Sequence, residues 1–439
     1  APGFEALAAW RRVKGVPSAL VFVKDLQFLG ADGRDEAERL REGIKVLRDE
    51  HPELKYLVLG GDAEEVPARS VYVWTDTYGF YNTDDNAPTD FYYADLDGDW
   101  DANGNGVYAE IDDGLDMHAE IAVGRLPVTT LDEAEIVVAK LVNYEKDPAA
   151  SYLDRVLLMS EPTGYYDIDS SLLLEKWSEQ ILPEGLELTK MYDDADNWPD
   201  AVQHSVENTI DAFDTGVGMA IHLGHGLESY LGYLRRDDVR GLSNGPYYPV
   251  YISCACYAGS FASYGKDAVG EMWLTNPDGG GVMYIGNTSI GIGYPPGQGF
   301  IKDMLEHLYD DGMLRAGDAW MAARESYIPA PSPLDDDGDP YRYTNFVLIM
   351  LGDPAMEIWL GEPGTLDVTL AAGAEILTVS VVDADGGAAL PGAVVAFEDA
   401  AGKVTTKKTD ADGQAEIAVP GVRNVTVSLG GYRPVQQTP

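Results

Sequence analysis

The sequence contains few cysteines and few basic residues, and it has no long apolar run. Its two cysteines, Cys254 and Cys256, are separated by one residue, a spacing that cannot link distant elements by a disulfide. The 30 Lys and Arg residues are outnumbered by 74 Asp and Glu residues, and the net charge of −44 repels nucleic acid and anionic membranes. Because no stretch of about 18 or more apolar residues occurs, we expect no membrane span. These absences favour a globular chain whose acidic surface suits calcium or a saline environment.

The chain divides into three blocks of different patterning. Residues 1–148 alternate helical periodicity with apolar, strand-like runs, namely ALVFV, KYLVLGG and EIAVGRL. Residues 149–362 repeat this pattern with near-continuous apolar runs, which are typical of parallel strands buried on both faces. Residues 363–439 contain short alternating strands separated by Gly, Asp and Pro turns. The pattern predicts an α/β fold with a parallel sheet between helices, followed by a small β-sandwich.

Three predicted strands of the second block end in side chains suited to nucleophilic catalysis. The run RVLLMS leads into Glu161, GMAIHLG into His225 and PVYISCA into Cys256, and open parallel sheets place their reactive groups beyond such carboxyl ends. A thiol is only a few per cent ionised at neutral pH, so it needs an imidazole to take its proton and a carboxylate to orient that imidazole. Gly224 and Gly226 leave room for a substrate backbone, and the amides of Gly226 and Cys256 form a candidate oxyanion hole.

Each of these residues also has a structural interpretation. Free cysteine usually packs as a small buried hydrophobe, which we expect for Cys254 but not for Cys256, since a turn begins directly after it. His222 precedes His225 by three residues and faces the other way in an extended strand, so we interpret it as structural. Glu161 has the alternative of a surface carboxylate or a helix cap.

At these residues the sequence resembles the gingipain-type cysteine peptidases, family C25 of the caspase-like clan. The histidine motif is GHGLES at 224–229, and the cysteine motif is ACYAGSF at 255–261. The resemblance covers roughly residues 8 to 361, and it extends to three further motifs in the expected order: KYLVLGGDAEEVPAR, AEIAVGRLPV and LGDPAMEIW. It implies a caspase-like three-layer sandwich in two subdomains, 1–148 and 149–362.

The resemblance also implies roles for individual residues. Glu161 occupies the position of the family's acidic triad member, before the histidine strand. In arginine-specific members a further acidic residue lines the specificity pocket, and Asp167 and Asp169 are its candidates here, in a loop that is shorter than the family's. Tyr294 falls near the aromatic residue that covers the pocket. A carboxylate at the pocket floor would favour an Arg or Lys side chain.

Both ends of the chain suggest further expectations. The chain begins inside a helix that the family usually precedes with a strand, so we expect an N-terminal segment or propeptide that is cleaved or held non-covalently. The N-terminal residues do not have the pattern of an uncleaved signal peptide. Block 363–439 resembles the immunoglobulin-like or carboxypeptidase-regulatory-like modules attached to secreted peptidases, which implies a secreted or cell-surface protein.

A calcium loop is predicted in the first block. The segment DWDANGNGVYAE, residues 99–110, fits the twelve-residue pattern of alternating oxygen ligands around a glycine turn. Without a clear helix pair around it, the loop is interpreted as structural, and a solvated acidic turn is the alternative. The candidate ligands are Asp99, Asp101, Asn103, Asn105 and Glu110.

Other acidic residues offer further calcium candidates. Asp95 and Asp97 extend the acidic run and allow a second or shifted site. A weaker candidate is the run LDDDGDP, with Asp335, Asp337 and Asp339, which fits a plain acidic loop equally well.

The function expected from these features is that of a secreted, calcium-stabilised cysteine endopeptidase that acts on protein or peptide substrates, with preference for Arg or Lys. The enzymatic alternative is a peptidase of the same clan with another side-chain preference. A catalytically silent surface or adhesion protein on the same fold is the alternative from another class, and retention of His225 and Cys256 argues against it. A glycosidase has only the abundance of carboxylates in its favour.

Overall fold

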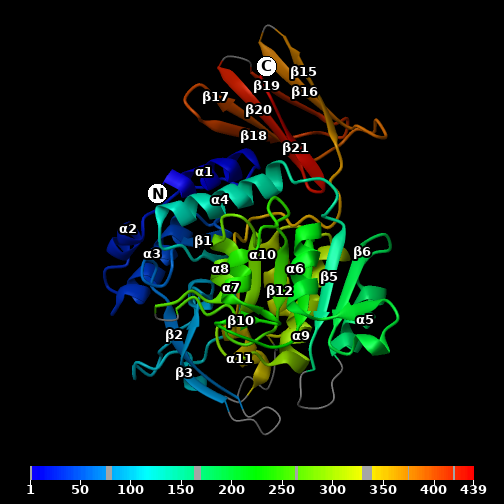
Figure 1. Cartoon of the computed structure of the whole chain (residues 1–439). Helices are drawn as coiled ribbons and strands as arrows, with labels where there is room; N and C mark the ends of the chain where they lie inside the picture. Colours follow the sequence, from blue (N-terminus) through cyan, green and yellow to red (C-terminus); the bar gives the residue numbers. More distant parts are fainter. Residues whose placement is uncertain are drawn as a thin grey trace.

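The computed structural model describes residues 2–75, 82–162, 170–262, 265–328, 339–373, 375–418 and 421–439. Its centre is a nine-stranded sheet in the order β1-β4-β14-β13-β12-β8-β5-β6-β7 (Figure 1). In that order the strands are Tyr56–Gly60, Ala122–Leu126, Leu348–Leu351, Met283–Asn287, Val250–Ser253, Met219–Leu223, Arg155–Ser160, Glu187–Tyr192 and Ala201–Gln203.

The sheet is parallel except at one pair. β13 and β14 run antiparallel, whereas β14 is parallel to β4 and β4 to β1. On the other side of this pair, β13, β12, β8, β5, β6 and β7 are all parallel to their neighbours. β14 therefore joins strands from residues 1–148 and 149–362 into one continuous sheet, and the carboxyl ends of β5, β8 and β12 share one edge.

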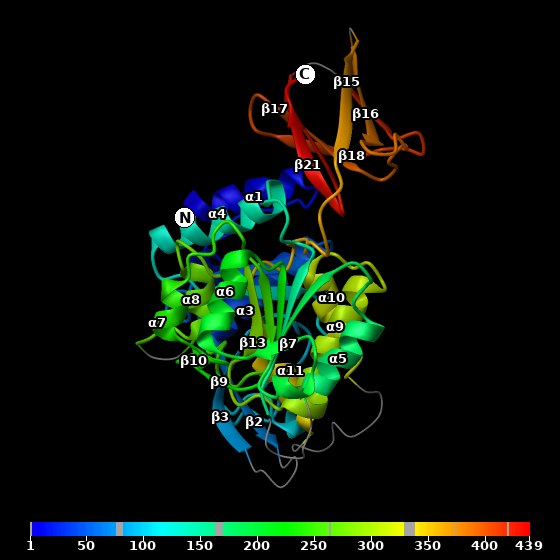
Figure 2. The same cartoon turned by 45° about the vertical axis from the view of Figure 1, so that its right-hand side comes forward.

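Helices cover both faces of the sheet, as the sequence predicts for a three-layer α/β fold. Figure 2 shows α6, α7 and α8 on one face and α5, α9 and α10 on the other. The helices are α1 (Pro2–Val13), α2 (Val23–Leu29), α3 (Glu36–Glu50), α4 (Leu131–Lys146), α5 (Ser170–Gln180), α6 (Val206–Thr215), α7 (Arg236–Gly241), α8 (Val269–Thr275), α9 (Gln298–Tyr309), α10 (Ala316–Glu325) and α11 (Pro340–Val347). No helix in the described ranges combines the length and the apolar character needed to cross a bilayer.

One predicted strand is wrong. The run ALVFV at 19–23 forms no strand, because residues 16–22 have no regular secondary structure and α2 begins at Val23. Leu20, Val21 and Phe22 are exposed, Phe22 by 53%. Local apolar character cannot supply the hydrogen-bonding partner that a strand requires, and within the described residues β1 pairs only with β4.

The C-terminal block forms two separate antiparallel sheets, in agreement with the predicted β-sandwich. One contains β15 (Leu366–Ala372), β16 (Ile376–Asp383) and β19 (Gln414–Ala418); the other contains β18 (Val404–Lys408), β17 (Val394–Asp399), β20 (Val422–Leu429) and β21 (Tyr432–Gln437). They enclose their own apolar core. The four-stranded sheet contacts α1 and α4 through β17, β18 and β21. Both sheets lie at the opposite end of the molecule from the hairpin of β2 (Arg69–Thr75) and β3 (Asn82–Thr89) (Figures 1 and 2).

Candidate active site

The three predicted catalytic residues follow three adjacent strands at one edge of the sheet. Glu161 comes directly after β5, His225 follows β8, and Cys256 follows β12. β8 pairs with β5 on one side and with β12 on the other, all in parallel. Strands that are adjacent and parallel deliver their carboxyl ends side by side, so the topology gathers Glu161, His225 and Cys256 from positions up to 95 residues apart in the chain.

Glu161 is a buried carboxylate that accepts a hydrogen bond from the turn after β8. Its side chain is about nine-tenths buried, and Oε2 accepts the backbone amide of His225 at 2.5 Å. The same oxygen lies 3.5 Å from Nε2 of His222. Burial acts to raise the pKa of Glu161, but the contact with His222 and the backbone amide of His225 outweigh it and lower this pKa to about 2. Glu161 is therefore ionised at neutral pH.

The imidazole of His225 is exposed, and a backbone carbonyl orients it. Its Nε2 lies 2.9 Å from the carbonyl oxygen of Pro162, the residue after Glu161. Glu161 thus contacts His225 through the main chain in this structure, while the ring has Pro162 as its hydrogen-bond partner. Direct orientation of the His225 ring by Glu161 stays a prediction.

Close packing explains the glycines on either side of His225. A Cβ at Gly224 would lie 2.5 Å from both Glu161 Oε2 and His222 Nε2. A Cβ at Gly226 would lie 2.9 Å from the Cβ of Ala255. Side chains at these positions would therefore separate the histidine turn from Glu161 and from the residues before Cys256.

Cys256 sits half-buried in the turn after β12 and is a thiol in its resting form. Its Sγ lies 3.8 Å from the carbonyl oxygen of Gly291, and burial raises its pKa above the ordinary range of cysteine. The thiol therefore requires a base to become a nucleophile. Cys254 is deeper, and burial raises the pKa of its thiol to about 12, which fits a packing role.

The turn that carries Cys256 has an uncommon backbone conformation. Tyr257 has φ 53°, in the left-handed region that non-glycine residues seldom occupy. Two contacts from the end of β13 hold the turn: Asn287 Nδ2 donates to the carbonyls of Cys254 and Ala255 at 2.9 and 3.1 Å. Such strained positions are maintained only where surrounding contacts fix them, and they concentrate at functional sites.

The two backbone amides proposed for the oxyanion hole donate no hydrogen bonds to the neighbouring strands. Among the described residues the Cys256 amide has no backbone or side-chain acceptor. Gly226 pairs with Leu231 across the hairpin of β9 (Gly226–Leu227) and β10 (Tyr230–Leu231), next to the bond from the Gly232 amide to the His225 carbonyl. Bonded and non-bonded pairs alternate in an antiparallel ladder, so the Gly226 amide points away from it.

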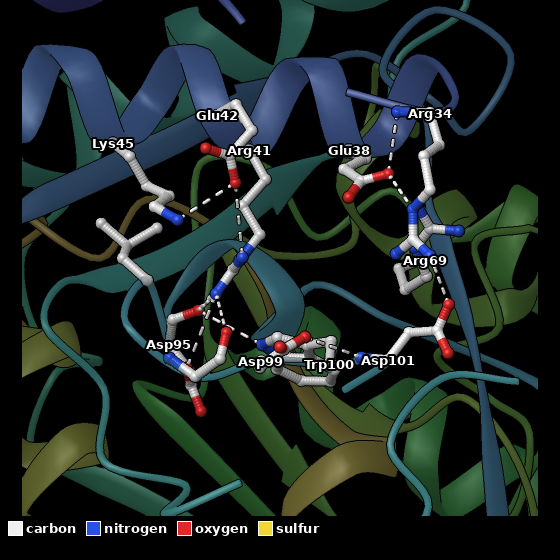
Figure 3. A network of polar contacts seen from close by, with 12 residues as sticks. Arg34, Glu38, Arg41, Glu42, Lys45, Arg69, Asp95, Asp99, Trp100 and Asp101 are labelled. Carbon is white, nitrogen blue, oxygen red and sulfur yellow. Dashed lines mark hydrogen bonds and ion pairs between the residues drawn. The ribbon is translucent and has the colours of Figure 1, made fainter. Parts of the chain in front are cut away.

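The predicted calcium loop is a compact turn. Only some of its candidate ligands contact one another. Oε2 of Glu110 accepts from Nδ2 of both Asn103 and Asn105, at 3.1 and 2.5 Å. Asp101 is paired instead with Arg34 at 2.5 Å (Figure 3). Asp99 is exposed and accepts the Asp101 amide at 3.3 Å.

A tighter acidic cluster lies beside this loop. Carboxylate oxygens of Asp95, Asp97 and Glu120 lie within 4.8 Å of one another. Asp95 is fully buried, its Oδ2 has no hydrogen-bond partner, and burial raises its pKa to about 6. Arg41, which reaches down from α3 in Figure 3, bonds to the backbone carbonyl of Asp95 at 2.8 Å and stays 3.8 Å from its carboxylate. An orphan carboxylate oxygen among two other acids fits a hard cation.

Comparison with known proteins shows the family to which the chain belongs. The model of peptidase family C25 matches residues 1–359. The chain belongs to peptidase family C25. This C25 peptidase is also 27% identical over 314 residues to an uncharacterized protein of Archaeoglobus fulgidus, covering 62% of this chain and 68% of the relative.

Solved structures show the same fold as this C25 peptidase. The complex of Porphyromonas gingivalis RgpB pro- and mature domains matches with a TM-score of 0.73 and 20% identity, over 99% of this chain and 96% of that one. The Arg specific cysteine proteinase gingipain R (RgpB) matches with a TM-score of 0.72 and 19% identity, over 100% and 95% of the two chains. The predicted caspase-like α/β architecture is confirmed.

Several predicted residues of this C25 peptidase are not placed. Asp167 and Asp169 lie outside the described residues, as do Asp335 and Asp337. Tyr294 lies in a π-helical turn, Gly293–Gly297, but its side chain is outside the described part.

Other residues of the site were not predicted from the sequence. Ser253 and Asn287 contact the residues before Cys256, and Glu120 completes the acidic cluster. Ser253 and Asn287 are polar residues within or at the end of apolar strands, and Glu120 directly precedes one. A polar residue next to an apolar run is the feature of the sequence that could have indicated all three residues.

Proposed function

We propose that this C25 peptidase is an endopeptidase that attacks peptide carbonyls through Cys256. His225 takes the thiol proton, gives it to the leaving amine, and then activates the water that resolves the acyl-enzyme. The observation that carries the proposal is the placement of His225 and Cys256 after the adjacent strands β8 and β12, in a chain of this family. The amides of Gly226 and Cys256 would stabilise the oxyanion, and Glu161 would hold the histidine turn.

A preference for Arg or Lys is the finer part of the proposal. It is supported by the acidic loop that contains Asp167 and Asp169 and by likeness to a protein described as an Arg-specific proteinase. A carboxylate in a pocket binds a guanidinium or ammonium group by charge-assisted hydrogen bonds. Tyr294 would cover that pocket. Another side-chain preference on the same dyad is the alternative.

The test is cleavage of fluorogenic peptides that end in Arg, Lys, Asn or Leu, with the Cys256→Ala variant as control. Cleavage after Arg or Lys that is lost in Cys256→Ala supports the complete proposal. Cleavage after Asn or Leu would retain the dyad and reject the acidic pocket. Activity that survives in Cys256→Ala would reject the dyad. Absence of activity, even after limited proteolysis to release a propeptide, would favour a non-catalytic surface role.

We also propose a structural calcium ion, with Asp95, Asp97 and Glu120 as its side-chain ligands. The orphan Oδ2 of Asp95 supports it, because a buried unpaired carboxylate is costly unless a cation compensates it. The loop 99–110 would hold a second ion only if the amides of Asn103 and Asn105 turned their oxygens inward and Asp101 left Arg34.

Calorimetry with and without calcium distinguishes the two sites. We expect calcium to raise the melting temperature of the wild-type protein, and we expect Asp95→Asn and Glu120→Gln to abolish this rise. Glu110→Gln should keep most of it. The matched control is Asp412→Asn, in an exposed turn of the C-terminal block. An equal response in Asp95→Asn and wild type would reject the cluster as the site, and a loss confined to Glu110→Gln would assign the ion to the loop.

We propose secretion or cell-surface display, with the C-terminal sheets as a stabilising or anchoring immunoglobulin-like module beginning near residue 363. The acidic composition and the family support an extracellular place. The complex of RgpB pro- and mature domains supports a propeptide partner for this chain as well.

A further inference from the structure

His222 connects the turns that carry the two catalytic residues. It lies in β8, opposite Met159 of β5 and Ser253 of β12, and none of its surface is exposed. Its Nδ1 lies 2.9 Å from Ser253 Oγ, and its Nε2 lies 3.5 Å from Glu161 Oε2. One ring thus contacts polar side chains from both neighbouring strands.

The hydrogen-bond directions along this connection are mutually consistent. The Ala255 amide donates to Ser253 Oγ at 3.1 Å, so the hydroxyl hydrogen is free to face Nδ1 of His222. With Nδ1 as the acceptor, a neutral His222 ring carries its hydrogen on Nε2, which faces Glu161 Oε2 at 3.5 Å and has no other partner among the described residues. The same oxygen of Glu161 accepts the His225 amide. The chain of contacts runs from Ala255, next to Cys256, to His225.

We infer that His222 is a positioning residue for catalysis, which fixes the His225 turn against the Cys256 turn through Glu161 and Ser253. The inference rests on the proposed function, since it assigns a role in that reaction. His222 itself does not reach the substrate, because it is buried beneath the turns. The two ring nitrogens act on different sides: Nε2 faces Glu161 on the histidine side, and Nδ1 faces Ser253 on the cysteine side.

Packing alone does not account for a histidine at this position. The other residues of β8, Met219, Ala220, Ile221 and Leu223, are apolar and buried, and burial of an imidazole among them is costly unless it is hydrogen-bonded. The absence of a side chain at Gly224 allows His222 and Glu161 to approach each other. The interpretation of His222 as structural, which was made from the sequence, does not include its contact with Glu161.

Two substitutions of His222 test the contacts of its two ring nitrogens separately. In His222→Gln the amide nitrogen reaches the position of Nε2 and donates to Glu161. In His222→Asn the amide oxygen reaches only the position of Nδ1 and accepts from Ser253. The control is His204→Phe, because the His204 ring packs on His222 with centroids 6.0 Å apart but does not bond to Glu161 or Ser253.

We expect His222→Asn to lower kcat by about 10- to 100-fold with KM within about twofold, since small displacements of a catalytic group have effects of this size. His222→Gln, which keeps only the contact with Glu161, should lower kcat by about 3- to 10-fold, and His204→Phe should stay within about twofold of wild type. If His222→Asn does not fold, Ser253→Ala interrupts the same chain of contacts and should lower kcat by about 3- to 10-fold.

Hydrogen–deuterium exchange of the peptide spanning residues 224–232 supplies a readout that needs no substrate. The His225 amide should lose protection in His222→Asn and keep it in His222→Gln. Equal kcat and equal protection in both variants, or wild-type kcat in Ser253→Ala where His222→Asn does not fold, would overturn the inference. If the wild-type protein cleaves no peptide, the proposed function fails, whereas the exchange experiment still decides the role of His222.

Discussion

At the scale of single residues, Gly224 sets the distance between the histidine turn and Glu161. We predict that Gly224→Ala lowers the free energy of unfolding by about 1–3 kcal/mol, because an added Cβ would overlap with Glu161 and His222. The same variant should lose at least tenfold in kcat. Chemical denaturation and peptide kinetics measure the two effects.

Gly241→Ala is the matched control for this substitution. Gly241 ends α7, and a Cβ added there would have no neighbour within 4 Å. Its stability should be unchanged or slightly increased, since alanine favours the helix. Similar losses in both variants would show that backbone flexibility, and not the contact with Glu161, matters at Gly224.

The lowered pKa of Glu161 predicts how the stability of the protein depends on pH. Its pKa in the folded protein, about 2, lies below its ordinary value, so its contribution is present above about pH 4.5 and is lost as the pH falls toward 2. We expect the unfolding free energy of Glu161→Gln to be lower than that of wild type by up to about 3 kcal/mol at pH 6. The difference should shrink below pH 4. Denaturation curves at several pH values check this, and a constant difference would contradict it.

At the scale of elements, the end of β13 supports the turn that follows β12. Asn287 donates to two buried carbonyls directly before Cys256. We predict that Asn287→Ala lowers the unfolding free energy by about 1–3 kcal/mol, since both carbonyls lose their donor. It should also slow alkylation of Cys256 by iodoacetamide and reduce kcat, because the turn loses its support.

Asn244→Ala provides the control for Asn287→Ala. Asn244 is also buried and donates to two carbonyls, those of Tyr247 and Gly280, but in a loop outside the turns that carry the catalytic residues. It should lose comparable stability and keep the alkylation rate and kcat of wild type. Equal kinetic losses in the two variants would indicate general loosening of the fold.

Local sequence signals define most elements of the catalytic region. Thr130 and Glu133 form the capping box of α4, with bonds of 3.2 and 3.0 Å between residues three apart in the chain. The apolar runs that form β5, β8 and β12 are also local signals, because each run is flanked by turn residues. ALVFV failed because a strand also needs a neighbour, which local patterning does not contain.

At the scale of the whole molecule, the C-terminal sheets and the catalytic edge lie far apart. We predict that a chain ending at Glu362 keeps the kcat/KM of wild type and melts several degrees lower. The truncated chain retains the hydrogen bonds that the backbone amides of Tyr152 and Leu153 donate to Glu362. The loss comes from the uncovered faces of α1 and α4 and from the contact of Val394 with Gly15 in the turn after α1. Calorimetry and peptide kinetics test both parts, and a large fall in kcat/KM would give the C-terminal block a direct role.

The sequence by itself determined the class of fold and the candidates for the reacting groups, because strand periodicity, glycine turns and the motifs around His225 and Cys256 are local properties of the chain. Only the tertiary structure decided which groups touch. Glu161 meets the backbone of His225 and the ring of His222, and Glu120 joins Asp95, because strand order and packing bring together residues that are distant in sequence. Contacts of this kind depend on register and burial across the sheet, which no single segment of the sequence specifies.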